Sequence, residues 1–140
     1  MQPRVDLISL GVRSVDASRN FYVEGLGWRV HREVRGEVLF IQVNHGLVLS
    51  LWDAGQMQAE AATDPPSGVP CITLSHNLAS VAEVDSVMAE AESAGAAIIA
   101  APKTQPWGGY TGYFADPDGY RWELAFNPTW AVDGAGKVTL

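Results

Sequence analysis

The stretch from Trp107 to Pro128, WGGYTGYFADPDGYRWELAFNP, decides the fold because it has the pattern of two strands joined by a tight turn. Asp116-Pro117-Asp118-Gly119 has the residues of a type I turn: a side-chain acceptor first, proline second and glycine fourth. The run from Gly112 to Ala115 before it is short and apolar. After it, Tyr120 to Phe126 alternates apolar and polar residues, the period of a strand with one face in the core. The sequence therefore predicts a β-hairpin whose second strand points Glu123 away from that core.

Composition indicates a compact acidic protein. The chain has 140 residues, of which 47% are hydrophobic and 18% charged, and this suits one globular domain with a sizeable core. The formal net charge of −7 would repel a phosphate backbone, and the sequence shows neither a signal peptide nor an apolar run of about 20 residues. With Cys71 as the only cysteine, no disulfide can form within the chain. We therefore expect a cytoplasmic protein that binds neither nucleic acid nor membrane.

The first half of the chain predicts a strand, a helix and three more strands. Leu7 to Val12 is rich in β-formers, and either Ser14 or Asp16 could cap the helix that follows and runs to Glu24. Gly25 and Gly27 provide its stop signal. The three later strands are Trp28 to Val34, Glu37 to Val43 and Leu47 to Trp52.

The second half predicts the same order after a linker over residues 54–70, in which Pro65 and Pro66 exclude regular structure. Cys71 to Ser75 is a short strand. A capping box at Ser80 starts a helix that ends at Gly95. Its expected apolar face consists of Val81, Val84, Val87, Met88, Ala91 and Ala94. Ala96 to Ala100 is the next strand, and the hairpin completes the half.

Two βαβββ modules in one chain predict an α+β fold. Module one spans about 5–53 and module two about 71–128, with a tail over 129–140, and we expect the whole of 1–140 to form one domain. Neither module could bury both faces of a four-stranded sheet alone, so each needs a partner. Sheet edges and the apolar tail from Trp130 to Leu140 also need cover, and we therefore expect a homodimer.

Two segments carry a resemblance to the vicinal oxygen chelate superfamily, which includes glyoxalase I, bleomycin-resistance proteins and extradiol dioxygenases. VRSVDASRNFYVEGLGW, residues 12–28, resembles the family's first strand and capped helix, and DPDGYRWEL, residues 116–124, resembles its closing hairpin. The resemblance covers roughly Val5 to Pro128. It implies that the modules curve their mixed sheets around a cavity, with helices on the outer faces, and that Glu123 faces this cavity.

The resemblance also implies where a divalent metal would bind, and the residues there argue against one. The family's ligand positions, on the first and fourth strands of each module, fall at Leu7, Ser50, Cys71 and Glu123. Only Glu123 is a usual ligand, and one carboxylate with one thiol is an incomplete shell for zinc, iron or manganese. We expect no cofactor, although a degenerate divalent-metal site around Glu123 stays open.

The candidate site residues are aromatic and polar groups around Glu123. Trp107 and Tyr110 lie in a Trp-Gly-Gly-Tyr loop that could fold over a cavity mouth. The predicted ligand contacts are Trp52, Trp107, Tyr110, Tyr113, Glu123, Ser50 and Cys71. Cys71 itself is interpreted as a small buried residue and not as a nucleophile. The three histidines, His31, His45 and His76, are dispersed near turns and indicate surface positions.

These features leave two functions open. The first is a metal-independent protein of the bleomycin-resistance type that sequesters an aromatic or cationic small molecule. The second is a lyase, isomerase or dioxygenase that uses Glu123 with Tyr113 for acid-base work, or a degenerate metal site. Glu123 could instead be a surface carboxylate paired with Arg121, which lies on the same strand face. A purely structural module would leave Trp107 unexplained.

Overall fold

The computed structural model describes residues 2, 4–61, 68 and 70–139. The chain divides into two compact units, Met1–Ser67 and Gly68–Leu140, so the division falls within the predicted linker. Part of that linker, residues 62–67 and 69, lies outside the described residues, as does Leu140 at the end of the tail. Each unit contains a four-stranded mixed sheet and helices, which confirms the α+β class. A cavity closed by both modules together stays a prediction.

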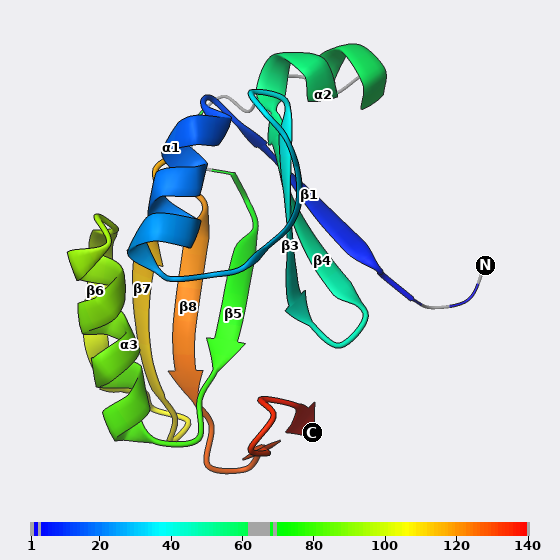
Figure 1. Ribbon diagram of the computed structural model, residues 1–140. Coiled ribbons are helices and arrows are strands. Elements are labelled where there is room, and N and C mark those ends of the chain that lie inside the picture. Colours follow the sequence, from blue (N-terminus) through cyan, green and yellow to red (C-terminus); the bar gives the residue numbers. More distant parts are fainter. Residues whose placement is uncertain (1, 3, 62–67, 69, 140) are drawn as a thin grey trace. The chain divides into compact units, whose positions relative to one another are not determined.

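The first unit has the predicted βαβββ order (Figure 1). Its sheet has the order β1-β4-β3-β2, with β1 parallel to β4 and the other neighbours antiparallel. Its elements are β1 Leu7–Val12, α1 Val15–Arg19, a π-helical segment Asn20–Gly25, β2 Val30–Val34, β3 Val38–Asn44, β4 Leu47–Asp53 and α2 Ala54–Ala61.

Helix α1 begins at a side-chain cap and covers one sheet face. Ser14 Oγ accepts a hydrogen bond of 3.2 Å from the backbone N–H of Ala17, so of the two predicted caps Ser14 is the one used. The helix packs on β3 and β4. The alternate strand residues Leu39, Ile41, Leu49 and Leu51 are all buried. Ser50 and Trp52 alternate with them and therefore lie on the opposite face of this sheet.

Helix α2 occupies the alanine-rich first part of the predicted linker, where no helix was predicted. Ala54–Ala61 is helical, and the Asp53 side chain accepts a hydrogen bond of 3.0 Å from the backbone N–H of Gln56. The segment is rich in alanine, glutamine and glutamate, which are good helix formers. Pro65 and Pro66 lie beyond it, so they cannot prevent this helix.

The second unit repeats the arrangement, with the sheet order β5-β8-β7-β6 and with β5 parallel to β8 (Figure 1). A short two-stranded hairpin, β9 with β10, follows the main sheet. The elements are β5 Thr73–Asn77, α3 Val81–Ser93, β6 Ala97–Thr104, β7 Tyr110–Ala115, β8 Arg121–Phe126, β9 Ala131–Val132 and β10 Val138–Thr139.

Helix α3 covers one face of the second sheet, as its apolar periodicity predicts. It packs on β6, β7 and β8, and it buries Val84, Met88 and Ala91. Val81, at the first turn, is exposed, so the buried stripe is shorter than predicted. Facing strand residues complete this core, among them Phe114 and Trp122, whose ring centroids are 6.2 Å apart. The Ser80 cap is confirmed, because Ser80 Oγ accepts a hydrogen bond from the backbone N–H of Glu83.

The predicted turn between β7 and β8 is present. The backbone N–H of Gly119 donates to the carbonyl of Asp116 at 3.0 Å, which closes a four-residue turn. The buried Asp116 carboxylate also accepts from the backbone N–H groups of Asp118 and Tyr120. This turn sets the pairing of the hairpin, so that Tyr113 lies directly opposite Glu123.

Candidate functional site

The site is built on the face of the second sheet that α3 does not cover. Trp122 and Leu124 on β8 are buried, and Glu123 lies between them on the other face, half-buried. Its register partner on β7 is Tyr113 and its partner on β5 is Ser75. Three polar side chains from three adjacent strands therefore meet in one row across the sheet.

The Glu123 carboxylate accepts hydrogen bonds from both neighbours in this row. Ser75 Oγ donates to Oε2 at 2.8 Å, and Tyr113 Oη donates to Oε1. Arg121 instead donates to the backbone carbonyl of Gly119 at 3.3 Å. The interpretation of Glu123 as the ion-pair partner of Arg121 is therefore wrong: the carboxylate is held by neutral hydroxyl donors.

The hydrogen bond to Glu123 raises the pKa of Tyr113 above the ordinary tyrosine value, and burial and the nearby negative charge act in the same direction. A smaller effect from the Thr111 hydroxyl lowers it. The phenol is thus neutral at pH 7 and serves as a proton donor.

The loop between β6 and β7 presents Trp107 to the same face. The backbone N–H of Gln105 donates to the carbonyl of Gly109 at 2.8 Å, and Gly108 adopts a φ of +93°, which closes a tight loop. A Cβ atom added at Gly109 would lie 1.8 Å from Cη2 of Trp107, so the indole rests directly over the Gly109 backbone. The side chain is nevertheless 56% exposed, which leaves aromatic surface available to a ligand.

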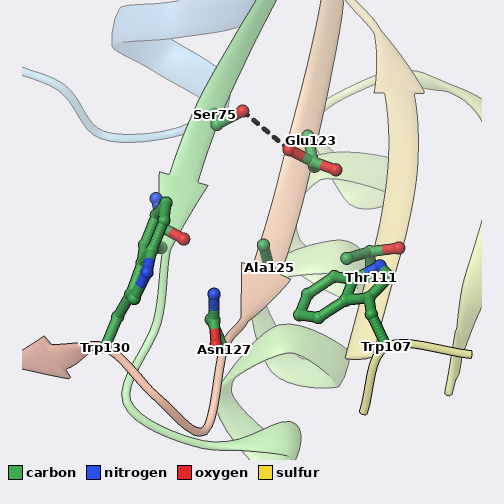
Figure 2. Close-up of a pocket in the computed structure, with 8 residues that line it drawn as sticks. Ser75, Trp107, Thr111, Glu123, Ala125, Asn127 and Trp130 are labelled. Carbon is green, nitrogen blue, oxygen red and sulfur yellow. Dashed lines mark hydrogen bonds between the residues drawn. The ribbon is translucent and has the colours of Figure 1, made fainter. Parts of the chain in front are cut away.

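Two adjoining pockets occupy this face. The first has a volume of about 280 Å³, and Figure 2 shows Trp107 and Trp130 on either side of Ala125 and Asn127, with the bonded Ser75 and Glu123 toward one end. Asn77 and Thr111 also line it. The second has a volume of about 320 Å³ and shares Trp107, Thr111 and Glu123 with the first. Its other lining residues are Ala100, Lys103, Gln105 and Tyr113.

Comparison with known proteins agrees with this architecture. Residues 4–124 match the model of the Glyoxalase/Bleomycin resistance protein/Dioxygenase superfamily. The chain belongs to this superfamily. A crystal structure of a glyoxalase-related enzyme from Fulvimarina pelagi is 35% identical, with 99% of each chain covered and a TM-score of 0.90. No curated protein sequence matches the chain significantly.

Two more distant members of the superfamily share the fold. A glyoxalase/bleomycin resistance protein/dioxygenase from Nocardioides is 23% identical, with 100% of this chain and 91% of that chain covered and a TM-score of 0.76. Lactoylglutathione lyase from Agrobacterium tumefaciens is 22% identical, with 94% of this chain and 98% of that chain covered and a TM-score of 0.71.

Across the described residues, no helix is long and apolar enough to cross a membrane.

Among the predicted site residues, Trp107, Tyr113 and Glu123 come together as expected, and Tyr110 does not. Tyr110 Oη donates a hydrogen bond of 2.8 Å to Asp85 on α3, and Tyr110 lines neither pocket. The reason is that β7 begins at Tyr110, two residues earlier than predicted. Strand alternation then places it with Phe114 on the helix-covered face.

The sheet register does not pair the predicted metal positions with one another. Leu7 pairs with Val48, whereas Ser9 lies opposite Ser50, and in the second unit Ser75, not Cys71, lies opposite Glu123. Cys71 is exposed and precedes β5, so its interpretation as a buried residue is wrong and it is not a neighbour of Glu123 in the sheet. The pairing of parallel strands that are far apart in sequence could not be read from either strand alone.

The residues that do pair with Ser50 and Glu123 do not complete a shell for a divalent metal ion. Ser9 and Ser50 in the first unit, and Ser75 in the second, supply neutral hydroxyls, and Glu123 supplies the carboxylate. In the described part of the chain, no three His, Cys, Asp or Glu side chains are grouped as metal ligands. His31, His45 and His76 are all exposed, as predicted.

Several residues that line the pockets were not predicted from the sequence, and the role of two predicted residues stays a prediction. Ser75 and Thr111 could have been found by strand alternation once the register was known. Trp130 was predicted to belong to the tail, although an aromatic residue so soon after β8 can indicate a position near the site. Ser50, which is only 2% exposed, and Trp52 lie on β4 of the first unit, and their role as ligand contacts stays a prediction.

Proposed function

We propose that this superfamily member binds a small planar molecule, aromatic or cationic, in the first pocket of its second unit, without a metal ion. The observation that supports this is the placement of two exposed indoles, Trp107 and Trp130, on either side of a floor that ends at the Glu123 carboxylate. Indole faces attract cations and stack on planar rings, and pockets of this kind bind small ligands.

Glu123 gives the slot between Trp107 and Trp130 a preference for cationic ligands. Its hydrogen-bond donors, Ser75 and Tyr113, are neutral, so they orient the carboxylate without cancelling its charge. No ion pair of Glu123 is found among the described residues. A cationic ligand therefore gains a Coulomb attraction that a neutral ligand of the same shape lacks.

The test uses two probes of equal shape, the cation benzamidine and neutral benzamide. Nitrogen-15 correlation spectra resolve the indole N–H signals of the five tryptophans, assigned with single Trp→Phe variants. We expect both probes to shift the signals of Trp107 and Trp130 and to leave that of the core residue Trp122 in place. Glu123→Gln should weaken benzamidine and not benzamide. A shift of Trp52 would support its predicted place at the same site.

Two variants test the wall that Trp107 forms. Trp107→Ala removes a stacking partner and should weaken binding by about 1–2 kcal/mol, or about five- to thirtyfold. Gly109→Ala should act in the same direction, because the added Cβ displaces the indole from the Gly109 backbone. Gly134→Ala is the matched control, since a Cβ there meets nothing within 4 Å. Undiminished binding in Trp107→Ala would refute the proposal.

An enzymatic function is the second candidate, and one contact favours it. Tyr113 donates a hydrogen bond to Glu123 at the pocket surface, so the pair could pass a proton to or from a bound substrate. A relative with 35% identity is described as a glyoxalase-related enzyme. A lyase, isomerase or dioxygenase reaction would require turnover that Glu123→Gln abolishes while substrate binding persists.

The cellular setting that we propose is the cytoplasm, with the protein acting as a homodimer and without nucleic-acid or membrane partners. The acidic net charge of −7 supports the exclusion of nucleic acid. The edge strands β6 and β2 support self-association, because unpaired strand edges favour contact with another chain.

A further inference from the structure

Lys103 is the one positively charged side chain that lines either pocket of the second unit in the part of the chain that the structure describes. It lies on β6 opposite Thr111, and Thr111 and Glu123 line both pockets. Its side chain is exposed, and no described carboxylate forms an ion pair with it. In a chain with net charge −7, this places a positive group beside the slot between the indoles.

The other polar groups around Lys103 already have partners. Gln105 Nε2 donates to Thr111 Oγ1 at 2.7 Å, and Tyr113 and Ser75 donate to Glu123. The Gln105 amide keeps a second N–H, but the Lys103 ammonium is the group in the second pocket that combines spare hydrogen-bond donors with a positive charge. The Lys103 end of the second pocket is thus suited to an anionic group, whereas Glu123, which lines both pockets, is suited to a cationic one.

The sheet register gives the separation of the two charges. Lys103 is on the second strand from Glu123, about 10 Å away across the sheet at ordinary strand spacing. It is also offset by two residues, or about 7 Å, along the strands, because its rung contains Thr111 and Ala125. The two directions are at right angles, so the Cα atoms of Lys103 and Glu123 are about 12 Å apart. Lys103 and Glu123 both line the second pocket together with Trp107, so an aromatic ring that packs against Trp107 can carry one substituent toward each charge.

We propose that Lys103 binds an anionic substituent, such as a carboxylate, on the planar ligand of this site, so that the ligand class is an aromatic compound with a cationic and an anionic end. This inference rests on the proposed function, because the ring must first occupy the slot between Trp107 and Trp130. Lysine provides a compact point charge without the bidentate geometry of arginine. Lys103 therefore contributes to the binding affinity through its charge, and this contribution decreases as added salt screens the charge.

The experiment compares benzamidine, benzoate and 4-amidinobenzoate, which carries both charged ends, by following the indole signals of Trp107 and Trp130. The measured quantity is the ratio of the affinity for 4-amidinobenzoate to that for benzamidine, because this ratio isolates the carboxylate. Lys103→Met should lower the ratio about two- to fivefold, as expected for an exposed ion pair. Lys103→Arg should retain most of it, and so should the control Lys137→Met, which removes a lysine that lines neither pocket.

The two proposals fail in different ways. A ratio that Lys103→Met leaves unchanged, while benzamidine still shifts Trp107 and Trp130, overturns the Lys103 inference and leaves the proposed function standing. An equal loss of the ratio in Lys137→Met also overturns it, because the effect would then belong to net charge. If none of the three probes shifts either tryptophan, both proposals are refuted. Benzoate should bind more weakly than 4-amidinobenzoate, since Glu123 repels it without a compensating cation.

Discussion

Glu123 and Tyr113 form the chemical centre of the site, and their hydrogen bond defines what each can do. The carboxylate accepts from two hydroxyls, one on each oxygen, so it stays oriented toward the pockets. The phenol donates a hydrogen bond to that carboxylate, and its pKa is raised mainly for this reason. Tyr113 is therefore available as a hydrogen-bond donor or acid at neutral pH, and it is a poor general base.

The raised pKa of Tyr113 gives a testable dependence on pH. Because the folded protein favours the neutral phenol, this stabilisation is fully present below pH 10 and is lost as the pH rises through the folded-state pKa. Glu123→Gln removes the charge and should move the pKa of Tyr113 back toward the ordinary value. Ultraviolet titration of the four tyrosines should show one group ionising at lower pH in this variant than in the parent protein.

The control for this titration is Tyr113→Phe, in which the shifted component should be missing. Tyr110, whose pKa is raised by its hydrogen bond to Asp85, should titrate alike in all three proteins. If Glu123→Gln and the parent protein titrate identically, the hydrogen bond between Tyr113 and Glu123 is not present in solution.

At the residue scale, strand alternation correctly predicted which face of its own strand a side chain occupies. It could not predict which residue lies opposite on a neighbouring strand. The alternation of apolar and polar residues on β7 and β8 was enough to predict that Tyr113 and Glu123 lie on the sheet face that α3 does not cover. Ser75 was missed because its position opposite Glu123 depends on the parallel register of β5 and β8. Tyr110 was misplaced because a strand that starts two residues earlier turns a loop residue into a face residue.

At the scale of elements, the helices show which local sequence signals are sufficient to predict a helix. The Ser80 cap and the apolar period of α3 were enough to predict that helix, since cap, pattern and packing agree. Helix α2 was not predicted, because residues 54–61 lie within the expected linker, ahead of Pro65 and Pro66. The composition of residues 54–61 favours a helix by itself, and the carboxylate of Asp53 caps it.

The buried face of α3 gives a prediction about stability with a control in the same helix. Val84 is fully buried, whereas Val81 is 42% exposed, although both belong to the predicted apolar face. Val84→Ala should lower the free energy of unfolding by about 1–3 kcal/mol, because two buried methyl groups and their contacts are lost. Val81→Ala should change it by less than about 0.5 kcal/mol. Urea denaturation of both variants measures the difference, and equal destabilisation would contradict the packing of α3.

At the scale of the whole molecule, the chain contains two βαβββ units, and one pair of residues on their first and fourth strands differs in one member. In each unit the first strand pairs in parallel with the fourth, and the equivalent pairs are Ser9 with Ser50 and Ser75 with Glu123. The repeat was predictable from the order of the elements, because each half gives the same sequence of strand and helix signals. The difference between the units was visible in the sequence only as the single carboxylate of Glu123. Its position opposite Ser75 could be known only from the strand register.

This asymmetry predicts how the protein behaves toward metal ions. Three of the four equivalent positions carry serine, whose neutral hydroxyl is a weak ligand, so the one carboxylate would have to hold a divalent ion almost alone. We expect the purified protein to contain no stoichiometric zinc, iron, nickel or manganese by elemental analysis. Treatment with a chelator should leave the melting temperature unchanged, because no bound ion contributes to folding. Glu123→Ala serves as the control and should have the same metal content as the parent protein. One equivalent of metal in the parent protein that Glu123→Ala loses would overturn both this prediction and the metal-free mode of binding, since Glu123 would then be a ligand.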